Sequence, residues 1–337
     1  MGRVDGPITF QKVSEALLAA EYFTERNAES VELLKASSRW VSDLYFVSVD
    51  FRFGRRGKYW IKIHPDAENE YIFLKKTYDH LSDYPSLSIV RPVAHLEGVD
   101  GVVTEHASGE ILSDMILRKL NRMRSLSHNG PQVQDYMYGC GKWLAALHSD
   151  RLSGHEAFRV EELLEYISER IEMLVQAGAI RREMAGRILR AMEKEVPLVH
   201  SDDLIRMRTH GDFAPYNVLV YESELVVHDC DAAGYFRGLE NYCPRYDDLV
   251  RFFGFTLEMS KVIVSKRVRR TLAGEFLRGY NDHTNLTVVR SSSAFKLFEL
   301  KYRLLGIFDV SSNVSRLIGK RGRAALFRRW FTEIFDA

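Results

Sequence analysis

Residues 209–229 read THGDFAPYNVLVYESELVVHD, and two apolar runs in this stretch flank the polar residues 222–224. Two short β-type runs separated by a few polar residues predict a hairpin. If the loop has three residues, Asn217 lies opposite Asp229 at the open end of the hairpin. Opposed residues of an antiparallel pair lie about 5 Å apart, so an amide oxygen and a carboxylate are expected to meet there.

The side chains of this hairpin suit a metal-dependent reaction. An amide oxygen and a carboxylate suit Mg²⁺, which takes a few protein oxygens and completes its shell with phosphate and water. Asp212 stands five residues before Asn217, where its carboxylate can accept a proton from an attacking hydroxyl. Phosphoryl transfer needs such a carboxylate, a metal and a cation on the phosphates. A solvated aspartate in an ordinary turn is the alternative for Asp212, but its spacing to Asn217 and Asp229 favours catalysis.

The same stretch resembles the catalytic loop and metal-binding strand of the aminoglycoside phosphotransferase and choline kinase superfamily. That family has His-Gly-Asp, an Asn five residues after the Asp, and an apolar strand that ends in Asp. The resemblance implies that Asp212 is the catalytic base, that Asn217 and Asp229 hold Mg²⁺, and that His210 braces the loop. It implies ATP as the donor of the phosphoryl group.

Segments upstream follow the family's order, and the resemblance covers about residues 35–285. Lys62, in the run YWIKI, resembles the phosphate-binding lysine, and Glu70 resembles its partner on the following helix. The run VVTEHASG resembles the adenine-binding hinge, where the backbone of Glu105 and Ala107 would meet the adenine edge. Alternatives remain here, because Lys62 alone also suits an edge strand and the nearby Glu68 also suits a surface helix.

The sequence departs from the family pattern in two places, and the first departure supports a rival function. Residues 35–40, KASSRW, stand where a glycine-rich phosphate loop is expected, and Cys230-Asp231 follows Asp229 in place of Phe-Gly. Asp231 could add a second carboxylate near the metal. A catalytically silent kinase-like binding module would tolerate the first departure, whereas the intact Asp212, Asn217 and Asp229 set argues against it. A metallohydrolase built on His210 and Asp212 lacks further histidines at ligand spacing.

Hydrophobic periodicity predicts a small mixed lobe before a larger helical one. Helices are expected at 8–36, 65–81, 111–126, 133–149, 160–175, 177–195 and from 247 onward, and strands at 43–53, 59–64, 88–96, 101–105 and within 208–229. With the resemblance, this order predicts an α+β, protein-kinase-like bilobal fold. The expected parts are an N-terminal nucleotide-binding lobe with an antiparallel sheet, 1–107, and a mainly helical catalytic and acceptor-binding lobe, 108–337.

The composition is that of an ordinary globular chain without strong charge bias. The 337 residues carry a formal net charge of +1, so a general nucleic-acid binder is not expected. Three cysteines without metal or redox spacing fit a reducing compartment. No apolar run is long enough to span a bilayer, and Met1–Gly6 has no signal-peptide core, so a cytoplasmic location is predicted.

The C-terminal residues form an amphipathic pattern with two interpretations. Apolar side chains recur at helical spacing over 326–335, and four arginines at 321, 323, 328 and 329 flank them. Such a helix can lie on a membrane surface, but docking on the large lobe with the arginines in water is favoured.

The expected acceptor is a hydroxyl of a small molecule. A sugar or glycan-related acceptor ranks first and an aminoglycoside second, because a near-neutral chain argues weakly against a polycationic antibiotic. The basic C-terminal segment argues weakly for an anionic or membrane-associated acceptor.

Overall fold

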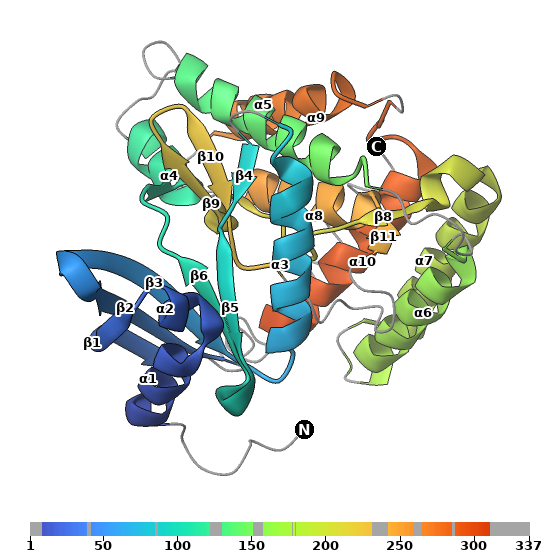
Figure 1. The fold of residues 1–337 in the computed structure, drawn as a ribbon. Coiled ribbons are helices and arrows are strands. Elements are labelled where there is room, and N and C mark those ends of the chain that lie inside the picture. The colour runs from blue at the N-terminus through green and yellow to red at the C-terminus, as the bar shows by residue number, and fades with distance from the viewer. Residues whose placement is uncertain are drawn as a thin grey trace. The chain divides into compact units, whose positions relative to one another are not determined.

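The computed structural model describes residues 9–38, 42–84, 87–121, 130–150, 158–176, 178, 180–230, 242–258, 265–284 and 287–310. The chain divides into two compact units (Figure 1), the first made of 1–115 with 216–241 and the second of 116–215 with 242–337. The first unit thus takes in a segment from the later part of the chain. The boundary predicted between residues 107 and 108 stays a prediction.

A five-stranded sheet dominates the first unit, in the order β1-β2-β3-β6-β5. All neighbouring strands are antiparallel, as predicted. Its strands are β1 (Ala28–Ser38), β2 (Asp43–Phe51), β3 (Arg55–Ile63), β5 (Pro92–Leu96) and β6 (Gly101–Glu105). Side chains of a strand alternate between the two faces. Along β3, Tyr59, Ile61 and Ile63 are therefore buried in the core, while Trp60 and Lys62 lie on the other face.

Helices α1 (Phe10–Ala19) and α2 (Glu21–Glu25) cover the core face of this sheet (Figure 1). Val13, Leu17 and Phe23 are fully buried against it. The predicted helix over 8–36 is wrong beyond Glu25, because residues 28–38 form β1. Asn27 turns the chain with a φ of 53°, and β1 then pairs with β2 along its length. Most side chains of β1 are exposed, so no apolar alternation marked it as a strand.

Helix α3 (Ala67–Leu81) follows β3. The predicted helix over 65–81 is confirmed, although it begins two residues later than expected. Its buried positions recur every three to four residues, as expected for a helix with one face on a core. They are Ala67, Glu70, Phe73, Leu74, Thr77 and Leu81. A carboxylate is therefore carried among the apolar residues of the buried face.

A second sheet of the first unit contains the predicted hairpin. Its order is β4-β10-β9-β7, with bounds Leu87–Ile89, Glu224–Val227, Val218–Tyr221 and Glu110–Ile111 respectively. Tyr221 pairs with Glu224, so the loop has two residues, and the predicted three-residue loop is wrong. Glu222 takes a φ of 54°, which allows the tighter turn. The shift places His228 opposite Asn217, and the His228 N–H donates to the Asn217 carbonyl at 3.0 Å.

The second unit is mainly helical, as predicted. Its helices are α5 (Gly130–Leu147), α6 (Val160–Gln176), α7 (Arg182–Glu195), α8 (Tyr246–Glu258), α9 (Lys266–Asn281) and α10 (Ser293–Val310). Strands β8 (Arg206–Arg208) and β11 (Tyr242–Pro244) pair beside them, and α4 (Leu112–Asn121) runs across the unit boundary. Short 3₁₀ turns occupy Arg52–Gly54, Glu97–Val99, Val196–Leu198, Ser201–Leu204 and Pro215–Asn217.

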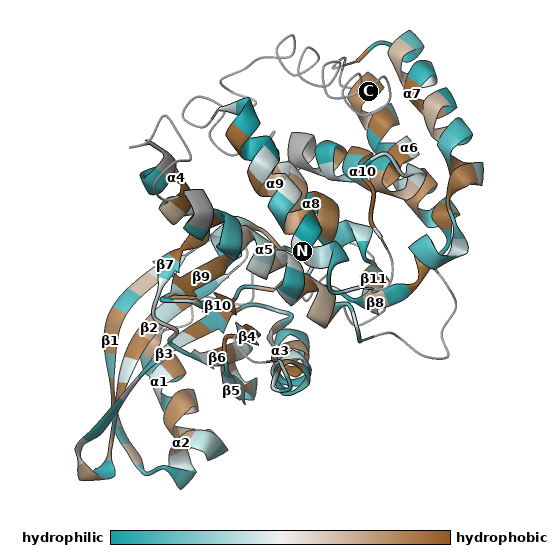
Figure 2. Ribbon diagram, turned by 90° about the horizontal axis from the view of Figure 1, so that it is seen from above, coloured by the Kyte–Doolittle hydropathy of each residue, from teal (hydrophilic) through white to brown (hydrophobic). Residues whose placement is uncertain are grey.

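Close packing of α5 and α9 organises the core of the second unit. An added Cβ at Gly279 would lie 2.0 Å from the Tyr138 carbonyl oxygen, so only glycine fits this crossing. A stack of aromatic side chains fills the core nearby, formed by Trp143, Phe213, Phe252 and Phe276. Polar and apolar residues alternate around α6 and α7 (Figure 2), as is typical of helices with one buried face.

No helix in the described part of the chain combines the length and apolarity needed to cross a bilayer. The helix predicted over 326–335, with the peripheral membrane contact considered for it, lies outside the described residues. So do Asp231 and residues 39 and 40 of the expected phosphate loop.

Candidate functional site

Lys62 forms the centre of a charged cluster in the first unit. Its Nζ lies 2.9 Å from Glu70 Oε2 and 2.7 Å from Asp229 Oδ1. Strand β3, helix α3 and the residues after β10 supply these three side chains, which are far apart in sequence. The structure therefore brings together three of the predicted site residues. Glu68, the alternative to Glu70, is exposed.

The two carboxylates keep the lysine charged. Burial opposes the charged form of Lys62, but the charges of Glu70 and then Asp229 outweigh it and raise the pKa above its usual value. Glu70 has a second partner, since its Oε2 lies 2.7 Å from His64 Nε2. Sequence reasoning missed His64. His64 stands two residues after Lys62, and in an extended chain this spacing puts both side chains on the same face. That spacing could have indicated that His64 lies near the site.

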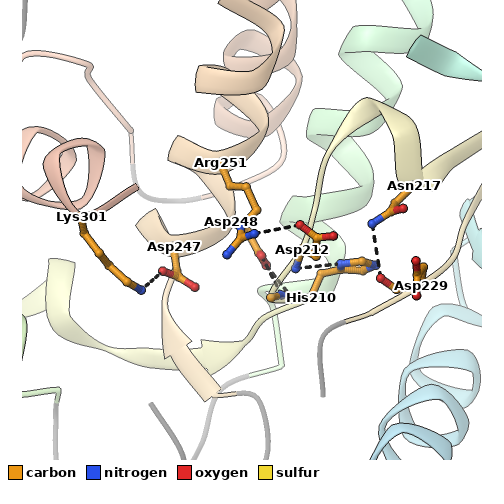
Figure 3. Close-up of polar contacts among 9 residues, drawn as sticks. His210, Asp212, Asn217, Asp229, Asp247, Asp248, Arg251 and Lys301 are labelled. Carbon is orange, nitrogen blue, oxygen red and sulfur yellow. Dashed lines mark hydrogen bonds and ion pairs between the residues drawn. The ribbon is translucent and has the colours of Figure 1, made fainter. Parts of the chain in front are cut away.

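Asn217 and Asp229 lie together at the end of the hairpin, as predicted, although the register differs. The Asn217 Nδ2 donates to the backbone carbonyl of Asp229 at 3.3 Å (Figure 3). Asp229 has a φ of 57°, a conformation that aspartate adopts more readily than most residues. The turn keeps Asp229 next to Asn217 beyond the last β pair.

The oxygens of these two side chains match the chemistry of a hard divalent cation. Amide and carboxylate oxygens are ligands that Mg²⁺ prefers, with phosphate and water completing its shell. Among the described residues, no group of three or more His, Cys, Asp or Glu side chains could hold a metal ion. Asn217 and Asp229 can offer two side-chain oxygens to such a cation, and a phosphate ligand and water would complete its shell.

The loop with Asp212 belongs to the second unit and is held by Asp248 of α8. Asp248 is fully buried. Its carboxylate accepts the N–H of His210 at 2.7 Å and the N–H of Gly211 at 2.9 Å (Figure 3). Gly211 has a φ of 80°, a conformation that strongly favours glycine. The His210 ring Nδ1 lies 3.3 Å from the Asp212 N–H, so His210 braces the loop, as the resemblance implied.

His148, at the end of α5, supports Asp248 from the other side. Its Nε2 lies 3.3 Å from Asp248 Oδ2 and its Nδ1 lies 3.0 Å from the Tyr280 hydroxyl. Burial, the largest effect, lowers the pKa of His148 although Asp248 favours its charged form. Burial would raise the pKa of Asp248, but the hydrogen bond and charge of His148 and the contacts with His210 lower it.

The side chain of Asp212 is paired with an arginine that sequence reasoning missed. Arg251 Nη1 lies 2.8 Å from Asp212 Oδ1 (Figure 3). Arg251 follows Asp248 by three residues on α8, and this spacing was a usable signal. Because the chain passes between the units after Pro215, Asp212 belongs to the second unit and Asn217 to the first.

Hydrogen bonds within the first unit already use some of the backbone groups of the predicted hinge. The Glu105 N–H donates to the Arg91 carbonyl at 2.9 Å, and the His106 N–H donates to the Lys58 carbonyl at 3.0 Å. These bonds use the amides of the hinge strand. The Glu105 carbonyl and the Ala107 amide are the groups that could meet an adenine edge.

An aromatic cluster, formed by Phe46, Trp60 and His106, lies next to Lys62 on the same face of the sheet. The rings of Phe46 and Trp60 stack with centroids 4.7 Å apart. The Trp60 Nε1–H donates to His106 Nδ1 at 3.2 Å. Burial, followed by the charge of Lys58, lowers the pKa of His106, which keeps its ring neutral and able to accept this bond.

Comparison with solved structures finds this fold in small-molecule kinases. A glucosamine kinase in complex with glucosamine, ADP and inorganic phosphate has a TM-score of 0.57 at 11% identity, over 95% of this chain and 98% of that one. An amicoumacin kinase bound to AMP-PNP and Ca²⁺ has a TM-score of 0.54 at 14% identity, over 91% and 88%. An ADP-bound aminoglycoside phosphotransferase has a TM-score of 0.51 at 17% identity, over 95% of each chain.

No protein-family model and no curated protein matches the sequence. At the identities found, the likeness to solved structures establishes the fold alone. The predicted α+β, protein-kinase-like fold, shared with aminoglycoside phosphotransferases, is confirmed.

Proposed function

We propose that this chain is a phosphotransferase that moves the γ-phosphate of ATP to a hydroxyl group of a small molecule. The observation that carries the proposal is the contact of Lys62 with both Glu70 and Asp229, at 2.9 and 2.7 Å. A lysine oriented by a helix glutamate, next to a metal-binding aspartate, is how kinases hold and neutralise phosphates. The fold, which is shared with kinases in complex with ADP and an ATP analogue, supports the same function.

Each residue of the first unit would have a role in nucleotide binding. Lys62 would bind the phosphates, and Glu70 would keep Lys62 in place. Asn217 and Asp229 would hold Mg²⁺, which when bound neutralises charge on the phosphates. The Glu105 carbonyl and the Ala107 amide would meet the adenine edge.

The aromatic cluster would add binding energy for the base. Trp60 lies two residues before Lys62 on the same face of β3, so a nucleotide whose phosphates meet Lys62 would place its base toward Trp60. Aromatic rings contribute favourable stacking with flat partners. Nucleotide binding should therefore change the fluorescence of Trp60.

Asp212 would act on the acceptor. The acceptor oxygen forms a bond to the γ-phosphorus as the bond to the bridging oxygen of ADP breaks, and Asp212 takes the hydroxyl proton. Its loop is held by two hydrogen bonds to the buried Asp248. Such fixed placement suits a group that must meet the acceptor in one orientation.

A sugar or glycan-related acceptor is the first candidate and an aminoglycoside the second. The glucosamine kinase among the structural neighbours supports the first, and the aminoglycoside phosphotransferase supports the second. The near-neutral charge of this chain favours the first over a polycationic substrate.

Two measurements test the function. A ligand that binds only the native state raises its stability, so MgATP should raise the melting temperature above that with Mg²⁺ alone. Transfer from γ-labelled ATP to a panel of sugars and aminoglycosides then identifies the acceptor. If millimolar MgATP leaves the melting temperature unchanged, the silent binding module is the better explanation.

A further inference from the structure

One face of α8 holds the Asp212 loop through two side chains. Asp248 and Arg251 are three residues apart on this helix, a spacing that puts both side chains on the same face. Asp248 binds the backbone amides of His210 and Gly211, and Arg251 binds the carboxylate of Asp212. The helix thus fixes both the course of the loop and the side chain that the loop presents.

The ion pair lies in a partly enclosed position. The side chains of Arg251 and Asp212 are 18% and 27% exposed. Tyr302 of α10 lies close enough to Arg251 and Asp212 to interact electrostatically with both of their charges. Burial is the main cause of its raised pKa, which the Arg251 charge lowers and the Asp212 charge raises. Its ring packs on α8 so closely that a Cβ at Gly254 would lie 2.6 Å from Tyr302 Cε1.

The ion pair of Arg251 and Asp212 is not explained by a large contribution to the stability of the fold. Solvent still reaches both side chains and screens their attraction, and the long Arg251 side chain loses freedom in the pair, so the contribution of the pair to stability is modest. Arg251 also belongs to a helix that has a stronger anchor in the buried Asp248. A guanidinium, however, presents several N–H donors in a rigid plane, so it restricts the rotation of a carboxylate that it binds.

We propose that Arg251 is a positioning residue that orients the Asp212 carboxylate for the acceptor hydroxyl. This proposal rests on the proposed phosphotransferase function. A carboxylate held in one rotamer meets the hydroxyl without first losing rotational freedom, and a small misplacement of a reacting group can slow a reaction about 10²-fold. The proposed effect of Arg251 on catalysis is exerted through Asp212, so this effect should vanish once Asp212 has been replaced.

A double-mutant cycle tests this dependence. The four proteins are the unaltered chain, Arg251→Gln, Asp212→Asn and the double variant, and the assay is Mg²⁺-dependent release of phosphate from γ-labelled ATP to water. Arg251→Gln is expected to lower kcat by roughly 10–100-fold and to leave the KM for ATP unchanged. In the Asp212→Asn background the same change should have no further effect. Arg251→Lys, which keeps the charge without the planar fork, should restore part of the loss.

Controls separate positioning from folding and from failure of the proposed function. Arg278→Gln removes another helix arginine, in an exposed pair with Glu275, and should leave kcat unchanged. All variants should keep the MgATP shift in melting temperature. If the unaltered chain itself shows no such shift, both the proposed function and the proposed role of Arg251 are wrong. With that shift intact, full kcat in Arg251→Gln, or equal losses in both backgrounds, would overturn the role of Arg251 alone.

Discussion

Replacing Asp248 with asparagine should destabilise the second unit more than any single surface change. The side chain is fully buried and accepts hydrogen bonds from two backbone amides, at 2.7 and 2.9 Å, and contacts His148. Asparagine keeps the shape but offers one acceptor oxygen and one donor nitrogen. One amide of the loop would therefore face another donor inside the protein.

The magnitude follows from the groups left without partners. A buried donor that loses its acceptor costs about 1–3 kcal/mol, and the loss of a charge-assisted bond adds to this. We expect a total of about 3 kcal/mol or more, which lowers the melting temperature of a unit of this size by roughly 6–12 °C. Kinase turnover should fall as well, because the loop with Asp212 loses its anchor.

Thermal unfolding followed by circular dichroism measures the effect. Asp282→Asn is the matched control, since Asp282 is half exposed at the end of α9 and pairs with Arg278. That variant should stay within about 1 kcal/mol of the unaltered chain. If Asp248→Asn is equally mild, Asp248 does not hold the loop and the account of the site is wrong.

Four further predictions follow from the site. Asp229→Ala should abolish Mg²⁺-dependent turnover and keep the fold; near-native activity in that variant would mean that another group holds the metal. Asp212→Asn should slow turnover by about 10²–10⁴-fold while the MgATP shift in melting temperature persists. MgATP should change tryptophan fluorescence, and Trp60→Phe should remove the change; an unaltered response would place the base elsewhere. Burial lowers the pKa of His148, so at mildly acidic pH the unfolded chain binds a proton at this residue that the native chain does not bind. The free energy of unfolding should therefore fall as the pH drops below about 6.5. Urea unfolding at several pH values tests this, with His148→Gln expected to flatten the curve and the exposed His200→Gln expected to leave it unchanged.

The parts of the fold that sequence reasoning located have strong local patterns. The hairpin of β2 and β3 and the helix α3 carry buried residues at the periods expected of strand and helix. Strand β1 was missed because its position is fixed by pairing with β2, and most of its side chains are exposed. The loop length of the later hairpin depended on the conformation of Glu222, which residue type does not determine.

The residues of the candidate site also differ in how well a local sequence pattern predicted them. Asp212, Asn217 and Asp229 lie within one short stretch, so their spacing carried the inference. Lys62 and Glu70 were located by order along the chain, and the structure shows their contact. Arg251 and His64 act through tertiary contacts with Asp212 and Glu70. Their spacing from Asp248 and Lys62 indicates which face each side chain shares, but it does not predict those contacts.

The discontinuous first unit has a consequence for how the protein is made. In the second sheet of that unit, the edge strand β4 pairs with β10, and β10 is encoded much later in the chain. Ribosomes add about 5–20 residues per second, so a nascent chain carries β4 for several seconds before its partner leaves the exit tunnel. During that interval the helices of the second unit are being translated and can begin to fold. The unpaired strand is a natural point for chaperone binding, and fragments that end before residue 224 should be prone to aggregation.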